Sequence, residues 1–341
     1  MSFIRTKLEP NKFYRLFILV KNRLTYRFDT FGHVIGFFSI LIGLFNYPLY
    51  LYLKKIVKTN DTKRLSMIFS ILKKGIGWGV LRYSSPEIRE EFSYIYNQHD
   101  LLRCKIDHKK ERKNLRNPYA KEIKEKGYTN LNIQFSEEDI QYVHKYFENK
   151  PFYSNQVPTQ GKFFNDGFLL DKDLNKPFIR CTDPNISLEC APIKKFCNSS
   201  LIQEIINSYF SYIPPIHSLI TVASFKNKYS KHHTQMPHRD YDHFIGITIF
   251  IYWTDVDSKN GATIFSPYSH RKNYIQDEIS LDTKAGGVYI ADTFALHYGK
   301  PISKDYRLAT WIRIGSIPNY SYLINDPFSY SINSNHNEQI F

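Results

Sequence analysis

The segment TQMPHRDYDHF, residues 234–244, places His238 and Asp240 two positions apart, just before a run of β-forming residues. In an extended segment, residues i and i+2 project from the same face. An imidazole nitrogen and a carboxylate oxygen would then point at one spot, as two ligands of one metal ion do. A pattern this short is more often a pair of solvated loop residues. The rest of the chain must therefore decide between a metal site and a loop.

A third metal ligand is available in the segment ADTFALHYGKPISKDYRLATWIR. His297 lies a few residues beyond the β-forming stretch GGVYIAD, and strands that are far apart in sequence lie side by side in a jelly roll. His297 could therefore complete a site begun by His238 and Asp240. Two imidazoles and one carboxylate on one face form the triad that holds Fe(II) and leaves coordination positions open.

An arginine follows at a useful position. Arg307 lies ten residues beyond His297, at the start of the next β-forming stretch. A guanidinium there can hold a carboxylate through a bidentate pair. 2-Oxoglutarate needs this feature, because its keto-acid end chelates iron and its far carboxylate requires a cation. Arg313 is in phase with Arg307 along the same strand, so both side chains could face the interior of a barrel.

Short β-forming stretches make up the part of the chain that must position these residues. Each is rich in Val, Ile, Thr and aromatic residues and is bounded by Gly, Pro, Asn or Asp. They are residues 218–225, 244–253, 262–266, 278–282, 286–292 and 307–315. Helices are expected only before them, one after Ser136 as N-cap and one at about 199–210. Consecutive strands without intervening helices predict an antiparallel barrel or sandwich of jelly-roll type.

The order of these motifs resembles the phytanoyl-CoA dioxygenase-like branch of the Fe(II)/2-oxoglutarate oxygenases, over about residues 126–316. That family typically shows H-x-D, a Trp-led strand ending near Asn-Gly, a P-G-S-H-like turn, a Gly-Asp strand, a distal His and an Arg. Here Trp253, Asn260–Gly261 and Pro267–His270 fill the middle positions, with Tyr268 where Gly is usual. Gly287–Val288 stands where Gly-Asp is usual.

The resemblance implies a mainly β protein with flanking helices and a double-stranded β-helix (jelly-roll) core. It implies that His238, Asp240 and His297 hold Fe(II), and that Arg307, whose offset from His297 matches the family, binds 2-oxoglutarate. The implied reaction is hydroxylation of a C–H bond of a small-molecule or lipid-linked substrate with O2, giving succinate and CO2. Asp240 favours hydroxylation, because related halogenases lack this carboxylate.

Two further residues are candidate contacts to the cosubstrate. Gln235 lies three positions before His238, and Trp253 leads the segment that ends at Asn-Gly. The competing interpretations are a plain loop amide for Gln235 and a core residue for Trp253.

Two other classes of function remain open at this point. One is a non-catalytic jelly-roll module that binds a ligand or glycan and retains a vestigial metal site. The other is a cupin-type isomerase or lyase that uses the metal without 2-oxoglutarate. Both leave Arg307 with a structural role only.

The net charge of +14 is unevenly distributed along the chain. Residues 1–126 carry 26 Lys and Arg against 11 Asp and Glu, whereas residues 127–341 carry 20 against 21. This change predicts a basic, mostly helical region at 1–126, an oxygenase domain at 127–317 and an irregular tail at 318–341. Residues 103–126 are expected to form an exposed helix and linker. The four cysteines show no zinc-type spacing, which indicates free thiols in a reducing compartment.

Residues 30–53 contain no Asp, Glu, Lys or Arg and are flanked by basic residues on both sides. As a helix they would span about 36 Å, although Pro48 and three glycines interrupt them. Such a run suits a hairpin that lies on an anionic membrane leaflet, with the oxygenase on the cytoplasmic side. The alternatives are helices packed on the enzyme core and a nucleic-acid contact, for which there is no recognition motif.

Overall fold

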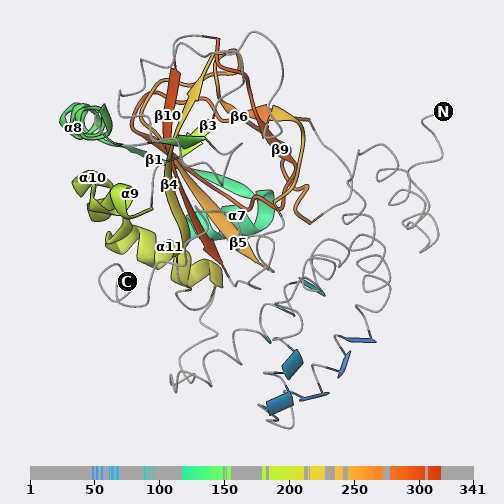
Figure 1. Ribbon diagram of the computed structural model, residues 1–341. Coiled ribbons are helices and arrows are strands. Elements are labelled where there is room, and N and C mark those ends of the chain that lie inside the picture. The colour runs from blue at the N-terminus through green and yellow to red at the C-terminus, as the bar shows by residue number, and fades with distance from the viewer. Residues whose placement is uncertain are drawn as a thin grey trace, which may run out of the picture.

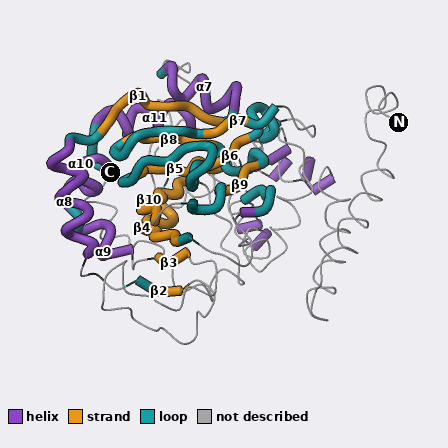
Figure 2. Tube along the Cα trace, turned by 90° about the horizontal axis from the view of Figure 1, so that it is seen from above, coloured by secondary structure: helices purple, strands orange, loops and turns teal. Residues whose placement is uncertain are grey.

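The computed structural model describes most, but not all, of the chain between residues 117 and 315. The described residues are 117–148, 150, 152–154, 179–181, 184–210, 214, 216–226, 235–240, 245–271, 277–303 and 306–315, with isolated positions between 48 and 95. Within them two antiparallel sheets face each other, and helices cover the outer face of the larger sheet (Figures 1 and 2). The expected mainly β fold with flanking helices, a double-stranded β-helix, is confirmed.

The major sheet has seven strands and the minor sheet three among the described residues. In spatial order the major sheet consists of β1 (Tyr128–Gln134), β8 (Gly287–Ala291), β5 (Gly246–Tyr252), β10 (Tyr306–Gly315), β4 (Ile216–Phe225), β3 (Ile179–Cys181) and β2 (Tyr153–Ser154). The minor sheet consists of β7 (Ile279–Ser280), β6 (Thr263–Phe265) and β9 (His297–Gly299). The helices are α7 (Pro118–Lys126), α8 (Glu137–Glu148), α9 (Pro184–Glu189), α10 (Ala191–Cys197) and α11 (Ser200–Phe210).

Strand β10 shows how the period of two along a strand separates two cores. Its even-numbered residues, Leu308, Ile312 and Ile314, belong to the apolar core that also contains residues of α7, α8, α10 and α11. Its odd-numbered residues face the inside of the barrel, where Ala309 and Trp311 join a second apolar cluster with side chains from β5, β6 and β8. Figure 2 shows the same division, with helices on one side of the major sheet and the minor sheet on the other.

Helix α8 begins as its sequence indicates. The Ser136 hydroxyl accepts a hydrogen bond from the backbone N–H of Asp139 at 3.1 Å, which is an N-cap contact. Val143 and Phe147, one turn apart, are fully buried against the major sheet. The helix expected from the apolar periodicity is therefore confirmed, and α11 confirms the helix expected near 199–210.

Helix α7 lies just before the domain boundary expected at 126–127 and is not the exposed helix expected within 103–126; residues 103–116 lie outside the described residues. Asn117 caps the helix by accepting hydrogen bonds from two backbone N–H groups, and Gly127 ends it in the left-handed conformation. Ala120 and Ile123 are fully buried in the same core as α8 and α11. The apolar core of the β-rich region therefore includes α7. The high charge of the segment concealed the buried face of this helix, which only Ala120 and Ile123 define.

Part of the basic region also packs against the oxygenase domain. Arg89 is 5% exposed, and its Nη2 donates a hydrogen bond to the carbonyl of His270 at 3.3 Å. Phe92 and Ile95 follow at helical spacing and are buried as well.

The apolar run 30–53 lies outside the described residues except for four helical positions, of which Leu51 and Tyr52 are exposed. The tail 318–341 lies outside them entirely. Where the chain is described, no helix is long and apolar enough to cross a membrane.

Candidate metal centre and cosubstrate pocket

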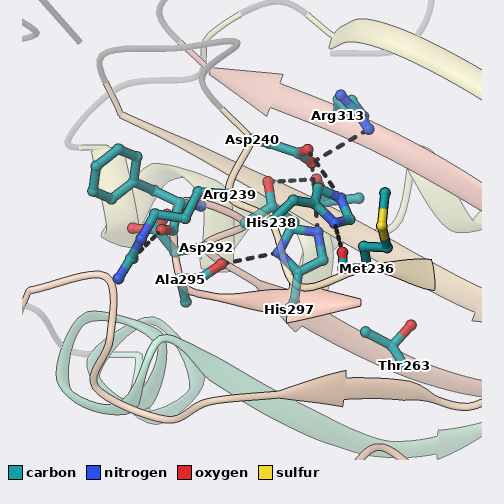
Figure 3. A network of polar contacts seen from close by, with 12 residues as sticks. Met236, His238, Arg239, Asp240, Thr263, Asp292, Ala295, His297 and Arg313 are labelled. Carbon is teal, nitrogen blue, oxygen red and sulfur yellow. Dashed lines mark hydrogen bonds and ion pairs between the residues drawn. The ribbon is translucent and has the colours of Figure 1, made fainter. Parts of the chain in front are cut away.

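His238 and His297 lie opposite each other on neighbouring extended segments (Figure 3). The backbone N–H of each donates to the carbonyl of the other, both at 3.0 Å. Residues that pair in this way project their side chains from the same face of a sheet. The two imidazole rings accordingly lie side by side, with centroids 4.4 Å apart.

Asp240 completes the group from the same segment as His238. Its backbone N–H donates to the carbonyl of Thr293 at 2.9 Å, which fixes the segment beside the loop that leads to His297. Asp240 Oδ1 lies 3.6 Å from His238 Nε2, and Oδ2 lies 3.8 Å from His297 Nε2. The candidate ligand atoms of all three residues lie within 4.8 Å of one another. The structure thus brings together the three residues that the sequence singled out.

Backbone carbonyls set the orientation of both imidazoles. His238 Nδ1 lies 2.8 Å from the carbonyl of Met236, and His297 Nδ1 lies 2.9 Å from the carbonyl of Ala295. A carbonyl only accepts, so each Nδ1 carries the proton and each Nε2 presents its lone pair to the centre of the group. This is the tautomer that a metal ligand requires.

The protonation states also suit a cation. Burial lowers the pKa of His297 to about 4, so this imidazole is neutral at neutral pH. Burial alone would raise the pKa of Asp240, but the positive charge of Arg313, the adjacent imidazoles and a hydrogen bond from Thr293 hold it below its usual range. Two imidazoles and one carboxylate are the donors that a non-heme Fe(II) site uses, so the residues fit the metal.

Arg307 lies in the barrel interior with no acidic partner among the described residues. It is 5% exposed; its two terminal nitrogens donate to the carbonyl of Gly261 and to the hydroxyl of Ser224, and its Nε has no hydrogen-bond partner in the described part of the chain. Burial lowers the pKa of this guanidinium. A buried cation without a countercharge is costly, so the pocket suits an anion such as the far carboxylate of 2-oxoglutarate.

The Asn-Gly dipeptide has a direct role in this pocket. Gly261 has a φ of 72°, and a Cβ there would lie 2.5 Å from Ile302 Cδ1 and 3.3 Å from Arg307 Cδ. Glycine therefore allows the chain to pass close to the arginine side chain and to place its carbonyl where Arg307 donates to it.

Arg313 shares the inner face of β10 but has a different neighbour. Its Nη2 lies 3.3 Å from Asp240 Oδ2, and its side chain is 24% exposed. The two arginines on this face therefore differ in their surroundings. Arg313 is bound to the metal-site carboxylate, whereas Arg307 offers its charge to the interior of the barrel.

The two remaining candidate contacts lie elsewhere. Trp253 is fully buried in the outer core, where its ring lies 4.8 Å from that of Phe135 and its Nε1 donates to Thr310 Oγ1 at 2.8 Å. This corrects its assignment as a cosubstrate contact, because the sheet separates it from Arg307. Gln235 lies half-buried in the turn before His238, and its role stays a prediction.

Sequence analysis missed the residues that complete the pocket and hold the loops. Ser224 and Tyr252 lie beside Arg307, and Tyr252 donates or accepts a hydrogen bond with Thr263 at 2.8 Å. Arg239, between the two ligands of H-R-D, binds the carbonyls of two loops. Only the position of Arg239 inside the motif could have drawn attention to it.

Comparison with known proteins now decides the family. The family model for phytanoyl-CoA dioxygenase matches residues 123–305, more than half of the chain. The chain belongs to the phytanoyl-CoA dioxygenase family. The family assignment made from the motifs is confirmed, and with it Fe(II) and 2-oxoglutarate as cofactors. Among curated proteins, no sequence matches this chain.

Several solved structures are similar to this member of the family at low identity. SnoN, a non-heme α-ketoglutarate-dependent epimerase from nogalamycin biosynthesis, aligns at 12% identity with a TM-score of 0.43, over 60% of this chain and 87% of its own. The carbocyclase SnoK aligns at 12% identity with a TM-score of 0.43, over 61% of this chain and 88% of its own. EctD from S. alaskensis, solved with bound Fe, aligns at 13% identity with a TM-score of 0.42, over 60% of this chain and 78% of its own.

Proposed function

We propose that this family member is an Fe(II)- and 2-oxoglutarate-dependent hydroxylase that acts on a C–H bond of a small-molecule substrate. The observation that carries the proposal is the combination, within one barrel, of the His238–Asp240–His297 group and the buried cation Arg307, which has no acidic partner in the described part of the chain. A binding module with a retained metal site or a metal isomerase would account for the three-residue group, but neither has a role for a buried cation beside it.

The residues of the site would bind either the metal or the cosubstrate. His238, Asp240 and His297 would hold the iron on one face and leave its other face to cosubstrate and O2. Arg307 would bind the far carboxylate of 2-oxoglutarate and so fix the orientation of its keto-acid end toward the metal. When bound, Fe(II) and 2-oxoglutarate supply the oxidising chemistry, with succinate and CO2 as co-products.

Apolar side chains line part of the barrel interior where this chemistry would take place. The inner cluster is apolar, with Phe250, Tyr252, Phe265 and Tyr289 among its members. A closed apolar lining strengthens the contact between Arg307 and a carboxylate and protects reactive species from solvent.

The first test is spectroscopic and needs no substrate. Anaerobic Fe(II) and 2-oxoglutarate together should give the weak visible absorption of their chelate on the wild-type protein. Asp240→Ala should abolish the band. The Arg307→Ala variant should show the band only at a much higher concentration of 2-oxoglutarate than the wild type requires. The absence of any band from wild-type protein that binds Fe(II) would exclude the 2-oxoglutarate oxygenase and favour the isomerase or binding module.

The second test addresses the substrate. Succinate release above the uncoupled background should be screened against amino-acid, glycan and lipid pools, and the product analysed by mass spectrometry. A mass gain of one oxygen would support hydroxylation, whereas a product of unchanged composition would indicate epimerisation and contradict it.

Attachment to a membrane, and with it a lipid-linked substrate, is a separate proposal that rests on the sequence of residues 1–126 alone. Expressed in cells, the full chain should pellet with membranes, and high salt should release it only partly, because salt does not screen apolar insertion. Full-length protein that stays in a low-salt supernatant without detergent would contradict this.

A further inference from the structure

Arg239 lies between two metal ligands in the chain but does not share their face. Because side chains alternate in an extended segment, Arg239 points away from the site (Figure 3). Its Nη1 donates to the carbonyls of Ser269 and Phe294, both at 2.6 Å. These carbonyls belong to two different loops, the turn after β6 and the loop between β8 and β9. The guanidinium also lies over the Phe294 ring, 5.4 Å from its centroid.

The loop between β8 and β9 carries His297 and is fixed to the turn after β6. The Ser269 hydroxyl accepts from the backbone N–H of Leu296 at 2.7 Å and donates to the carbonyl of Ser266 at 2.6 Å. The backbone N–H of Ser266 donates to the carbonyl of Leu296 at 2.9 Å. The ligand histidine is therefore positioned directly after a residue that is held by two hydrogen bonds.

Arg89 supplies a second guanidinium to the same loop from outside the matched family region. Its Cζ lies 3.1 Å from the centroid of the Phe294 ring, and its Nη2 donates to the carbonyl of His270, next to Ser269. A guanidinium that lies over the face of an aromatic ring is attracted to it by a cation–π interaction, which is stronger when the pair is buried. The basic N-terminal region thus contacts the loop that leads to a metal ligand.

We propose that Arg239 and Arg89 are positioning residues that clamp residues 292–296, and so hold His297 in ligating geometry beside His238 and Asp240. The inference rests on the proposed metal site and extends it in two ways. It gives the middle residue of H-R-D a defined task. It also gives the N-terminal region, which lies outside the matched residues 123–305, a role in positioning a metal ligand.

The test measures metal affinity in the full chain. Co(II) serves as the probe, followed by calorimetry and by its visible d–d absorption, which reports coordination geometry. Residues that orient metal ligands typically contribute 10- to 100-fold in affinity, so Arg239→Gln should weaken Co(II) binding by about that factor and alter the band. Arg239→Lys should recover much of the loss, because one ammonium can donate to both carbonyls. Arg89→Met should weaken binding by a smaller factor, on the order of tenfold.

The control variant is Arg271→Gln, which removes an exposed arginine from the same turn and should leave Co(II) affinity unchanged. If Arg239→Gln fails to fold, Arg239→Lys and Ser269→Ala carry the test, and Ser269→Ala should weaken binding through loss of the Leu296 contact. Wild-type affinity in both Arg239 variants, or an equal loss in Arg271→Gln, would overturn the clamp. Absence of Co(II) binding in the wild type would instead overturn the metal site itself.

Discussion

The two faces of strand β10 differ in how their buried polar groups are paired. On the outer face, Thr310 bonds to Thr221 Oγ1 at 2.9 Å and accepts from Trp253, and Thr221 bonds in turn to Ser187 at 2.9 Å. On the inner face, Arg307 keeps an Nε without a hydrogen-bond partner in the described part of the chain.

The difference separates stability from function. A fully paired network of neutral groups in the outer core satisfies every hydroxyl and fixes the packing of the helices. A charged group left incompletely paired in the inner core costs stability in the empty protein and is compensated when a ligand arrives. Buried charge with incomplete pairing therefore marks the functional face of this sheet, and substitutions on the two faces should have different consequences.

The largest effect is expected from the metal ligands. His238→Ala, Asp240→Ala and His297→Ala should each abolish 2-oxoglutarate turnover, because removal of one of three ligands destroys the donor set. The fold should persist, as measured by circular dichroism and by thermal unfolding without metal, because these side chains contribute little to the apolar cores. Turnover at the wild-type rate in any one variant would show that its residue is not a ligand.

The outer face should give the opposite result. Ile312→Ala removes a side chain that is 1% exposed in the core between the sheet and the helices. A substitution of this kind typically lowers the free energy of unfolding by about 2–5 kcal/mol. Urea denaturation measures the loss, and the folded fraction should keep the wild-type KM for 2-oxoglutarate. A raised KM with unchanged stability would contradict the division between the faces.

Arg307→Ala should act on the cosubstrate alone. Loss of a charge-assisted contact in a closed site costs on the order of 2–4 kcal/mol, which corresponds to a rise in the KM for 2-oxoglutarate of about 30- to 900-fold. Affinity for Co(II) in the absence of 2-oxoglutarate should stay unchanged. Arg313→Ala is the matched control on the same face, and it should change metal affinity more than the KM for 2-oxoglutarate because Arg313 pairs with Asp240. The reverse pattern would exchange the roles of the two arginines.

The sequence was sufficient for the features that depend on local pattern. Short β-forming stretches without intervening helices predicted the jelly roll, and H-x-D with a distal histidine predicted the three clustered residues. Features that depend on non-local pairing were not accessible. Strand β9 has only three residues, and it is defined by its pairing with β6 and by the bridge from His297 to His238. Phase alone did not distinguish Arg307 from Arg313, because the difference is made by Asp240 and Gly261, which lie on other segments.

Helical segments with mixed composition were the other gap. Helices α9 and α10 each begin with or next to a proline and are six and seven residues long, too short for an apolar period to be recognised. In α7 the many charged residues led to the prediction of an exposed helix, although Ala120 and Ile123 form a buried face. These helices form part of the outer core, so the sequence predicted the functional face of the molecule better than its supporting face.

Two tryptophans allow the finest comparison of the faces with one chemical change. Trp253→Phe removes an N–H that donates to Thr310 in the outer core, so the free energy of unfolding should fall by about 1 kcal/mol, while the KM for 2-oxoglutarate stays at the wild-type value. Trp311 lies on the inner face, where it is partly buried and packs edge-on against Phe250 with ring centroids 6.3 Å apart. Trp311→Phe should leave stability nearly unchanged and alter turnover with substrate, because this ring borders the interior of the barrel near Arg313. Paired urea denaturation and succinate-release kinetics measure both effects. A raised KM for 2-oxoglutarate in Trp253→Phe would indicate that Trp253 does contact the cosubstrate. The assignment of structural and functional roles to the two faces of the sheet would then be wrong.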